Sequence, residues 1–231
     1  MIRLRDFRAI VFFTGAGLSA ESGVPAYRGR GGVWDRYRWE EYACQRAFLA
    51  EPEQVWNFHE VRRRAVAAAE PNAGHRAIAR AQREFPGTVV VTQNIDGLHQ
   101  RAGSAGVIEL HGSLWRARCE REGAVTELPE VPIRSRRCAC GEYLRPDVVW
   151  FEDALDPRVV GAAVDAISRC DLFVSVGTSG LVYPAADLPA IAVERGATCV
   201  EINIEDTPVS SWYHHRLRGP AAEVLRSLAP E

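Results

Sequence analysis

The residues between positions 15 and 29 are mostly glycines and other small residues, and they follow directly on the apolar run 9–13. An apolar run of this kind predicts a buried parallel strand, and the glycines after it let backbone N–H groups approach a phosphate closely. A helix that begins there would favour negative charge at its N-terminus. The pattern Gly15-x-Gly17-x-x-Ala20 is therefore typical of a loop that binds a pyrophosphate, although a glycine-rich turn without a ligand has the same spacing.

The residues after this loop bear on the chemistry that it serves. In a nicotinamide dehydrogenase, a second strand would end in an acidic residue about 20 positions further on and hold the ribose. Residues 28–35 are instead rich in glycine and arginine, and Asp35 stands at that distance within a loop. The sequence is therefore consistent with a dinucleotide-binding loop, but it disfavours a dehydrogenase that transfers a hydride.

Polar residues follow four apolar runs, at the points where predicted strands end. Gln93, Asn94 and Asp96 follow one run, and His111 follows the next. Ligands of open α/β sheets bind beyond the carboxyl ends of the strands, and a histidine placed there is a candidate general base. Local capping turns would also explain one such cluster. Two further clusters end later runs: Gly177, Thr178, Ser179 and Gly180, then Asn203, Ile204 and Glu205.

The elements that must position these residues alternate between strand and helix. Apolar runs predict buried strands over residues 10–13, 88–92, 106–110, 172–176 and 199–204. Apolar residues at helical spacing predict helices over residues 74–85, 159–168 and 185–194. This alternation indicates an α/β fold with a doubly wound parallel sheet. Two excursions from the sheet are predicted to form one smaller domain: residues 31–72 and residues 116–146.

Composition excludes several classes of function. The net charge is −2, with both signs interspersed, so nothing favours nucleic acid or a membrane surface as a partner. No apolar stretch approaches the roughly 20 residues of a membrane-spanning helix, and the charged first residues lack a signal-peptide core. We therefore expect a cytoplasmic protein. All 28 basic residues are arginines, which excludes mechanisms that need a lysine.

The motifs together resemble the sirtuins, a family of NAD-dependent protein-lysine deacylases. Six segments carry the resemblance in the family's order: residues 15–29, 92–103, 110–113, 145–151, 177–186 and 201–205. The resemblance implies a Rossmann-like NAD-binding domain over residues 1–30, 73–115 and 147–231. It also implies a smaller inserted domain over residues 31–72 and 116–146, made of a helical module and a zinc-ribbon-like module.

The same resemblance implies roles for individual residues. His111 would be the catalytic base, with Gln93 and Asn94 at the nicotinamide ribose. The implied partners are acylated-lysine proteins or peptides, and the implied products are nicotinamide, O-acyl-ADP-ribose and free lysine. The residues implied to bind NAD are Gly15, Ala16, Gly17, Ala20, Glu21, Arg28, Trp34, Gln93, Asn94, Ile95, Asp96, Gly177, Thr178, Ser179, Asn203, Ile204, Glu205 and Ala221.

The chain departs from the family where the substrate would bind. Sirtuins that act on succinyl- and malonyl-lysine carry a Tyr-x-x-Arg pair, and here His59 replaces the tyrosine while Arg62 is kept. Arginine can pair with an acyl carboxylate through two hydrogen bonds, so succinyl removal is expected beside acetyl removal. The adjacent arginines would equally fit a solvent-exposed face of a helix. Val149 and Phe151 are implied to pair with the substrate backbone as an added strand.

The metal module also departs from the family. Structural zinc takes four ligands, and Cys119, Cys138 and Cys140 supply three thiols. In a cytoplasmic chain such a cluster favours a metal over a disulfide. Glu122 stands where a fourth cysteine would fall, so the sequence leaves open either a zinc site completed by a carboxylate or a module packed without metal.

The sequence as a whole predicts an NAD-dependent protein-lysine deacylase. Two other functions would use the same NAD site, namely mono-ADP-ribosyl transfer and NAD sensing without turnover. His111 favours deacylation, because pure transfer has less need of a base.

Overall fold

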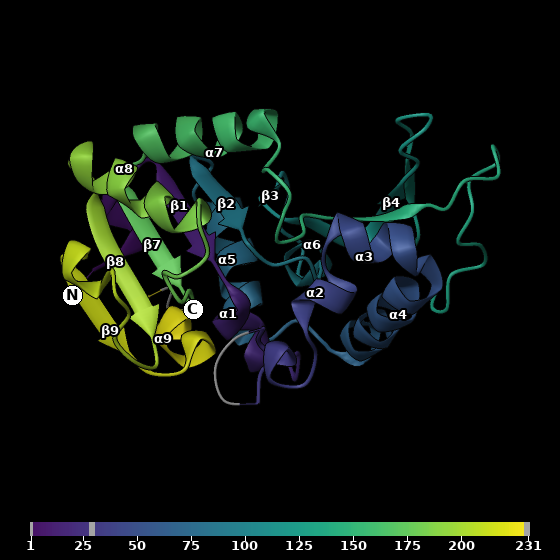
Figure 1. The fold of residues 1–231 in the computed structure, drawn as a ribbon. Coiled ribbons are helices and arrows are strands. Elements are labelled where there is room, and N and C mark those ends of the chain that lie inside the picture. Colours follow the sequence, from purple (N-terminus) through teal and green to yellow (C-terminus); the bar gives the residue numbers. More distant parts are fainter. Residues whose placement is uncertain (1, 28–30, 229–231) are drawn as a thin grey trace.

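The computed structural model describes residues 2–27 and 31–228, and its strands form two sheets (Figure 1). All neighbouring strands of the larger sheet are parallel. Its spatial order reverses direction between β1 and β7, which is the doubly wound, Rossmann-like arrangement. In that order the strands are β3 (Ile108–Glu109), β2 (Thr88–Thr92), β1 (Ile10–Thr14), β7 (Leu172–Val176), β8 (Thr198–Asn203) and β9 (His215–Arg218).

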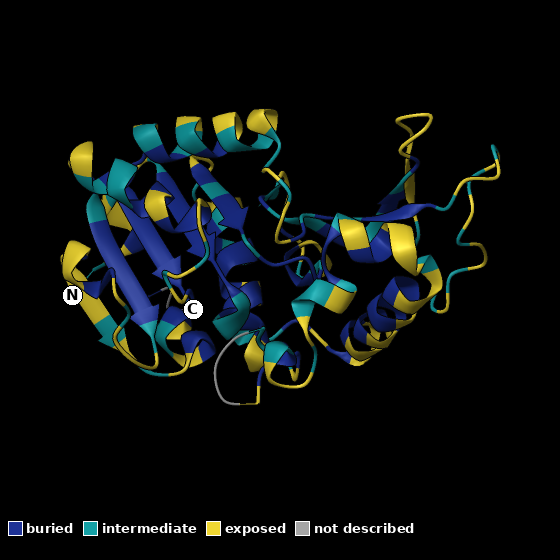
Figure 2. Ribbon diagram, in the orientation of Figure 1, coloured by how far each residue is buried: buried dark blue, intermediate teal, exposed yellow. Residues whose placement is uncertain are grey.

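Helices cover both faces of this sheet and turn their buried sides toward it (Figure 2). Alternate residues of β1 pack against the two layers, and every one of them is buried, which explains why this run is apolar throughout. One layer contains α5 (Ala73–Glu84) and α9 (Ala221–Leu228), and the other contains α7 (Pro157–Arg169) and α8 (Leu188–Glu194).

Short helices complete the connections around the sheet. The α-helical ones are α1 (Ala16–Ala20), directly after β1, and α6 (Leu98–Arg101), shortly after β2. The 3-10 turns are η1 (Leu4–Asp6), η2 (Val33–Asp35), η3 (Ala185–Asp187) and η4 (Ser210–Trp212).

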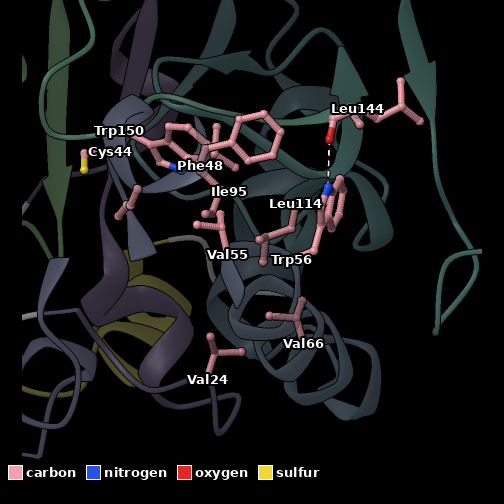
Figure 3. Close-up of a cluster of buried hydrophobic side chains, with 14 of the residues drawn as sticks. Val24, Cys44, Phe48, Val55, Trp56, Val66, Ile95, Leu114, Leu144 and Trp150 are labelled. Carbon is pink, nitrogen blue, oxygen red and sulfur yellow. Dashed lines mark hydrogen bonds between the residues drawn. The ribbon is translucent and has the colours of Figure 1, made fainter. Parts of the chain in front are cut away.

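The second sheet is antiparallel and packs with three helices at the other end of the molecule (Figure 1). Its buried cluster is rich in aromatic residues, and Trp56 donates its indole N–H to the carbonyl of Leu144 at 2.7 Å (Figure 3). The strands are β5 (Val125–Glu127), β4 (Gly112–Arg118) and β6 (Arg145–Val148), and the helices are α2 (Trp39–Tyr42), α3 (Gln45–Ala50) and α4 (Pro52–Ala68).

The predicted strands and helices of the larger sheet are confirmed, with two marked differences in extent, whereas strand β9 and helices α6 and α9 were not predicted. The strand expected over residues 106–110 is reduced to β3, and the helix expected over 185–194 is divided into η3 and α8. The omitted strand is β9, whose residues are mostly exposed because it forms the edge of the sheet. Within residues 2–27 and 31–228, no helix combines the length and apolar character needed to cross a membrane.

Candidate functional site

The glycine loop lies at the point where the strand order of the large sheet reverses. Gly15 and Gly17 follow β1, Gly177 follows β7, and Gly17 donates its N–H to the carbonyl of Gly177 at 2.9 Å. A Cβ at Gly15 would lie 2.8 Å from that carbonyl oxygen, and one at Gly17 would lie 2.7 Å from the Cα of Gly177. Only residues without side chains allow the two loops to approach this closely, and they meet at a position where dinucleotides bind in such sheets.

Two buried polar side chains from the β2 end meet this loop. Asn94 donates its side-chain N–H groups to the carbonyl of Gly15 at 3.0 Å and to the hydroxyl of Ser19 at 3.1 Å. Ser19 in turn donates to a carboxylate oxygen of Asp96 at 2.7 Å. Burial is the main cause that raises the pKa of Asp96 above its usual range. Ser19 was not predicted as a site residue, although it lies inside the glycine-rich run.

A narrow pocket opens between this network and the helices of the smaller sheet. Arg62 and Tyr27 contribute to its wall, with the Arg62 guanidinium 4.7 Å from the centre of the Tyr27 ring. Burial raises the pKa of Tyr27, so its hydroxyl stays protonated at neutral pH. The residues that line the pocket are Ala16, Ser19, Val24, Pro25, Tyr27, Arg62, Val66, Asn94, Ile95, Asp96 and Leu114.

His111 lies between β3 and β4, beside the end of β2. Its Nδ1 is 2.9 Å from the carbonyl oxygen of Gln93, and because a carbonyl only accepts, Nδ1 carries the proton. Nε2 is therefore the atom with the free lone pair. Burial lowers the pKa of His111 below 6.5, so the ring is neutral at pH 7 and able to accept a proton. The carbonyl of His111 accepts the N–H of Val149 at 3.0 Å, which ties the predicted substrate segment to the predicted base.

The groups predicted to hold the second half of a dinucleotide lie at the ends of β7 and β8. Asn203 donates its side-chain N–H to the carbonyl of Thr178 at 2.8 Å, while Ser179, Ile204 and Glu205 are exposed. Ala221 begins α9 and is buried.

Two carboxylates hold this region together. Glu21 accepts the N–H of Ala222 at 3.0 Å, so it links α1 to the start of α9. Glu201 is buried on β8 and accepts hydrogen bonds from the hydroxyls of Thr207 and Ser210 and from Arg218. Glu201 thereby fixes the exposed loop after β8. Glu201 was not predicted as a site residue, since the sequence around it is that of an ordinary strand.

The structure separates the predicted acyl-binding residues. Arg62 lines the pocket, but His59 is absent from the lining and packs against Trp56, Phe58 and Trp150. Neither ring nitrogen of His59 has a hydrogen-bond partner among the described residues. Burial, reinforced by nearby arginines, lowers the pKa of His59 to about 3, so the ring is neutral.

The remaining predicted contacts surround the mouth of the site. Phe151 is exposed, packs edge-on against Trp34 with ring centres 5.4 Å apart, and also contacts Trp39. Trp34 also stacks on Phe58, which lies on α4. Arg28, predicted to bind NAD, lies outside the described residues.

In the structure, Glu122 lies beside the three cysteines as a fourth possible metal ligand. The ligand atoms of Cys119, Glu122, Cys138 and Cys140 all lie within 4.8 Å of one another. The Cys138 thiol donates to the Glu122 carboxylate at 3.3 Å, and the sulfurs of Cys119 and Cys140 are 3.5 Å apart. Three thiolates and one carboxylate are a donor set that fits tetrahedral zinc.

Comparison with known proteins supplies the closing observation. A sequence model of the Sir2 family matches residues 15–184. A Pyrobaculum aerophilum protein named NAD-dependent protein deacylase 2 is 50% identical over 234 residues, covering 99% of this chain and 92% of the relative. Among solved structures, a mutant Sir2 homologue in complex with ADP-ribose matches with a TM-score of 0.94 and 41% identity, covering 98% of this chain and 92% of that one. A Sir2 homologue in complex with NAD matches with a TM-score of 0.90 and 42% identity, covering 98% and 90%.

Proposed function

The chain belongs to the Sir2 family, and from that premise we propose that it is an NAD-dependent protein-lysine deacylase. Its substrates are acylated lysines in proteins or peptides, and its products are nicotinamide, O-acyl-ADP-ribose and free lysine. One observation carries the proposal: Asn94 and Asp96 bind the glycine-rich segment at the switch point of the sheet, and His111 binds the carbonyl of Gln93 in the same turn after β2.

The glycine cradle fits a dinucleotide. Gly15 and Gly17 pack directly on the backbone of Gly177, where a Cβ would collide, and this contact places the loop where a pyrophosphate lies in such sheets. We assign the phosphates to Gly15, Ala16 and Gly17, with Ala20, Glu21, Arg28 and Trp34 around them. We assign the adenosine half to Gly177, Thr178, Ser179, Asn203, Ile204, Glu205 and Ala221.

The nicotinamide half is assigned to the turn after β2. When bound, NAD supplies a ribose carbon that the acyl oxygen attacks as nicotinamide leaves. Asn94 is held by Gly15 and Ser19, so its amide has a fixed orientation toward the ribose. Asp96 is buried with a raised pKa and is suited to bind a neutral carboxamide. Gln93 and Ile95 complete this side of the pocket.

His111 is assigned as the base. Its Nδ1–H is held by the carbonyl of Gln93, which points the free Nε2 lone pair away from the β2 end. At that atom the ring takes a proton from a ribose hydroxyl, so the oxygen can attack the activated acyl group. The neutral state that burial imposes is the state that this step requires.

The acyl group and the peptide are assigned to the opposite wall. Arg62 is buried in the pocket and offers its guanidinium to an acyl carboxylate, as in a succinyl group. His59 is kept as a substrate-side residue through its place on α4 beside Arg62, where its ring packs against Phe58 and Trp150. Val149 and Phe151 are assigned to the substrate backbone. We retain the proposed division into a Rossmann-like domain (1–30, 73–115 and 147–231) and a small domain (31–72 and 116–146).

The proposal is tested by nicotinamide release from NAD with matched peptides that bear acetyl-lysine, succinyl-lysine or unmodified lysine. We expect release only with the two acylated peptides. Replacing Arg62 with methionine should lower kcat/KM for the succinyl peptide about tenfold or more relative to the acetyl peptide, because a charged hydrogen-bond donor to the carboxylate is lost. A ratio unchanged by Arg62→Met would contradict the acyl-pocket assignment.

The same assay separates the alternatives. Nicotinamide release without acyl-lysine, together with ADP-ribose attached to protein, would indicate mono-ADP-ribosyl transfer. NAD binding without release from any peptide would indicate an NAD sensor. Either result would overturn the deacylase.

We propose zinc at Cys119, Cys138, Cys140 and Glu122, where it would act as a structural cross-link of the small sheet. Purified protein is expected to contain about one zinc per chain by elemental analysis. Glu122→Gln should speed zinc loss to a chelator about tenfold or more, because an anionic ligand is removed. The matched control is Glu127→Gln on exposed strand β5. Less than about a tenth of an equivalent of zinc in the unmodified protein would exclude the site.

A further inference from the structure

A tryptophan of the smaller sheet holds the turn that carries Asp96. Trp115 lies on β4, and its indole N–H donates to the backbone carbonyl of Asp96 at 2.6 Å. The neighbouring Leu114 donates its own backbone N–H to the carbonyl of Ile95 at 2.8 Å. The side chains of Leu114 and Ile95 lie in the same buried cluster (Figure 3). Two consecutive residues of β4 therefore bind two consecutive carbonyls of the turn after β2.

The contact between the indole and the turn is close enough to restrict the sequence. Gly97 has a φ of +74°, and a Cβ there would lie 2.9 Å from both Cδ1 and Nε1 of Trp115. A side chain at this position would be strained by the backbone and would also press on the indole. Glycine thus serves both the left-handed turn and the packing of the ring on it.

A buried arginine also packs over the indole ring. The Arg63 guanidinium lies 5.0 Å from the centre of the Trp115 ring, and Arg63 has no exposed surface. It donates to the carbonyls of Leu114, Leu128 and Glu130, the last two at 2.6 and 2.7 Å. Its Nε also lies 3.1 Å from a carboxylate oxygen of Glu60. A side chain with this many partners cannot move independently, so the indole is packed against a rigid support.

The carboxyl of Asp96 is fixed from the opposite direction. Its two oxygens accept the Ser19 hydroxyl at 2.7 Å and the N–H of Leu98 at 2.8 Å. The side chain is therefore anchored in the large sheet's loops, while its backbone is anchored in the small sheet. Relaxing the Trp115 bond would let the peptide at Asp96 rotate and would turn the carboxyl relative to the pocket.

We propose that Trp115, supported by Arg63, is a positioning residue that sets the affinity of the deacylase for the nicotinamide end of its dinucleotide substrate. This inference rests on the proposed function, because it takes Asp96 to face nicotinamide. Trp115 does not line the pocket and acts only through the turn. The interaction also joins the two sheets at the site, so the small sheet contributes to dinucleotide recognition without a direct contact.

The test compares Trp115→Phe with Trp56→Phe. Phenylalanine keeps an aromatic ring against Arg63 and removes the N–H. Trp56 makes the same kind of bond, from its indole to the carbonyl of Leu144 at 2.7 Å, away from the turn. Three quantities are measured for each variant: the inhibition constant of added nicotinamide, the dissociation constant of ADP-ribose, and the melting temperature.

Trp115→Phe is expected to raise the nicotinamide inhibition constant about tenfold, the usual effect of one lost hydrogen bond to a buried group, and to raise KM for NAD in the same direction. ADP-ribose lacks nicotinamide, so its dissociation constant should stay unchanged. Trp56→Phe should lower the melting temperature while leaving the nicotinamide constant unchanged. Gly97→Ala, whose Cβ would press on the same indole, should reproduce the Trp115→Phe pattern and serves if that variant does not fold.

Two results would overturn the inference. An unchanged nicotinamide constant in Trp115→Phe would show that the indole bond does not set this affinity. An equal loss of ADP-ribose binding would show general loosening of the fold instead of positioning. If the unmodified protein releases no nicotinamide with any acyl-lysine peptide, the proposed function fails first and this inference fails with it.

Discussion

Replacing His111 with asparagine is expected to lower kcat for deacylation about 10²–10⁴-fold, the usual contribution of a general base. Asparagine can still donate to the carbonyl of Gln93, which His111 Nδ1–H contacts at 2.9 Å, but it cannot take up a proton. Because His111 touches neither the glycine loop nor the β7 and β8 ends, the affinity for ADP-ribose should remain within a few-fold. The measurement is single-turnover formation of free lysine from an acetyl-lysine peptide.

The pH profile of the unmodified enzyme supplies a second arm of this prediction. A neutral imidazole is required, and burial lowers the pKa of His111 below 6.5. The rate should therefore persist at pH 6.5 and fall only as the pH drops further, through the lowered pKa. In His111→Asn this acidic limb should disappear along with the activity.

A matched control comes from β9. His215 is exposed on the edge strand, so His215→Asn should leave both kcat and the acidic limb unchanged. A fall of less than about threefold in His111→Asn would remove this residue from the role of base and leave the positioning of the substrates to account for the rate.

The large sheet was predictable because its strands are buried on both faces. The runs at β1, β2 and β7 are apolar without alternation, and such runs stand out in a sequence. β9 was missed for the opposite reason: as an edge strand it is exposed, and its residues include two arginines and a histidine. The length of β3 was overestimated because the flanking Val107 and Leu110 are apolar and buried or partly buried, although only Ile108 and Glu109 pair in register with β2.

The polar residues at the strand ends were also predictable, since every parallel strand of the sheet ends at the same edge. The contacts between the two sheets and their helices could not be predicted. The bond from Trp115 to Asp96 and the arginine behind it join residues on β4 and α4 to a turn after β2, and no periodicity or motif records such long-range pairs. The place of His59 was missed similarly, because burial among aromatic rings depends on how α4 packs against Trp150.

A loss of stability at mildly acidic pH is the other large effect that the structure leads us to expect. Three histidines are buried and neutral: burial lowers the pKa of His59 and His75 to about 3 and that of His99 to about 4. In the unfolded chain each has a pKa near 6.5. Between pH 6.5 and about 4 the unfolded state therefore binds more protons, so the free energy of unfolding falls as the pH falls.

The three sites differ in how firmly they resist protonation. His99 has its Nε2 2.8 Å from the hydroxyl of Thr14, which donates its own proton to Thr92, so Nε2 carries the proton and Nδ1 is free. The His75 ring centre lies 5.0 Å from that of His99, so a charge on one ring opposes a charge on the other. His59 is surrounded instead by the positive charges of arginines, which oppose a further charge there.

Each proton excluded from the fold costs about 1.4 kcal/mol per pH unit, and domains of this size are stable by only about 5–15 kcal/mol. By pH 5 three such groups acting together lower the free energy of unfolding by about 6 kcal/mol, a large part of that stability. Urea unfolding followed by circular dichroism at pH 8, 7, 6 and 5 measures the slope directly. A free energy of unfolding that stays level between pH 7 and pH 5 would contradict the assignment of neutral buried rings.

His59→Leu is the sharpest variant for this effect. Leucine fills the same space beside Trp56 and Trp150 without burying two ring nitrogens that have no hydrogen-bond partner among the described residues. We expect the variant to be as stable as the unmodified protein at pH 8 and more stable at pH 5, with the slope reduced by about one proton. Because His215 is exposed, His215→Leu should leave the slope unchanged. The histidine at position 59 therefore makes the stability of the buried cluster around the smaller sheet depend on pH, which a tyrosine or leucine there would not do.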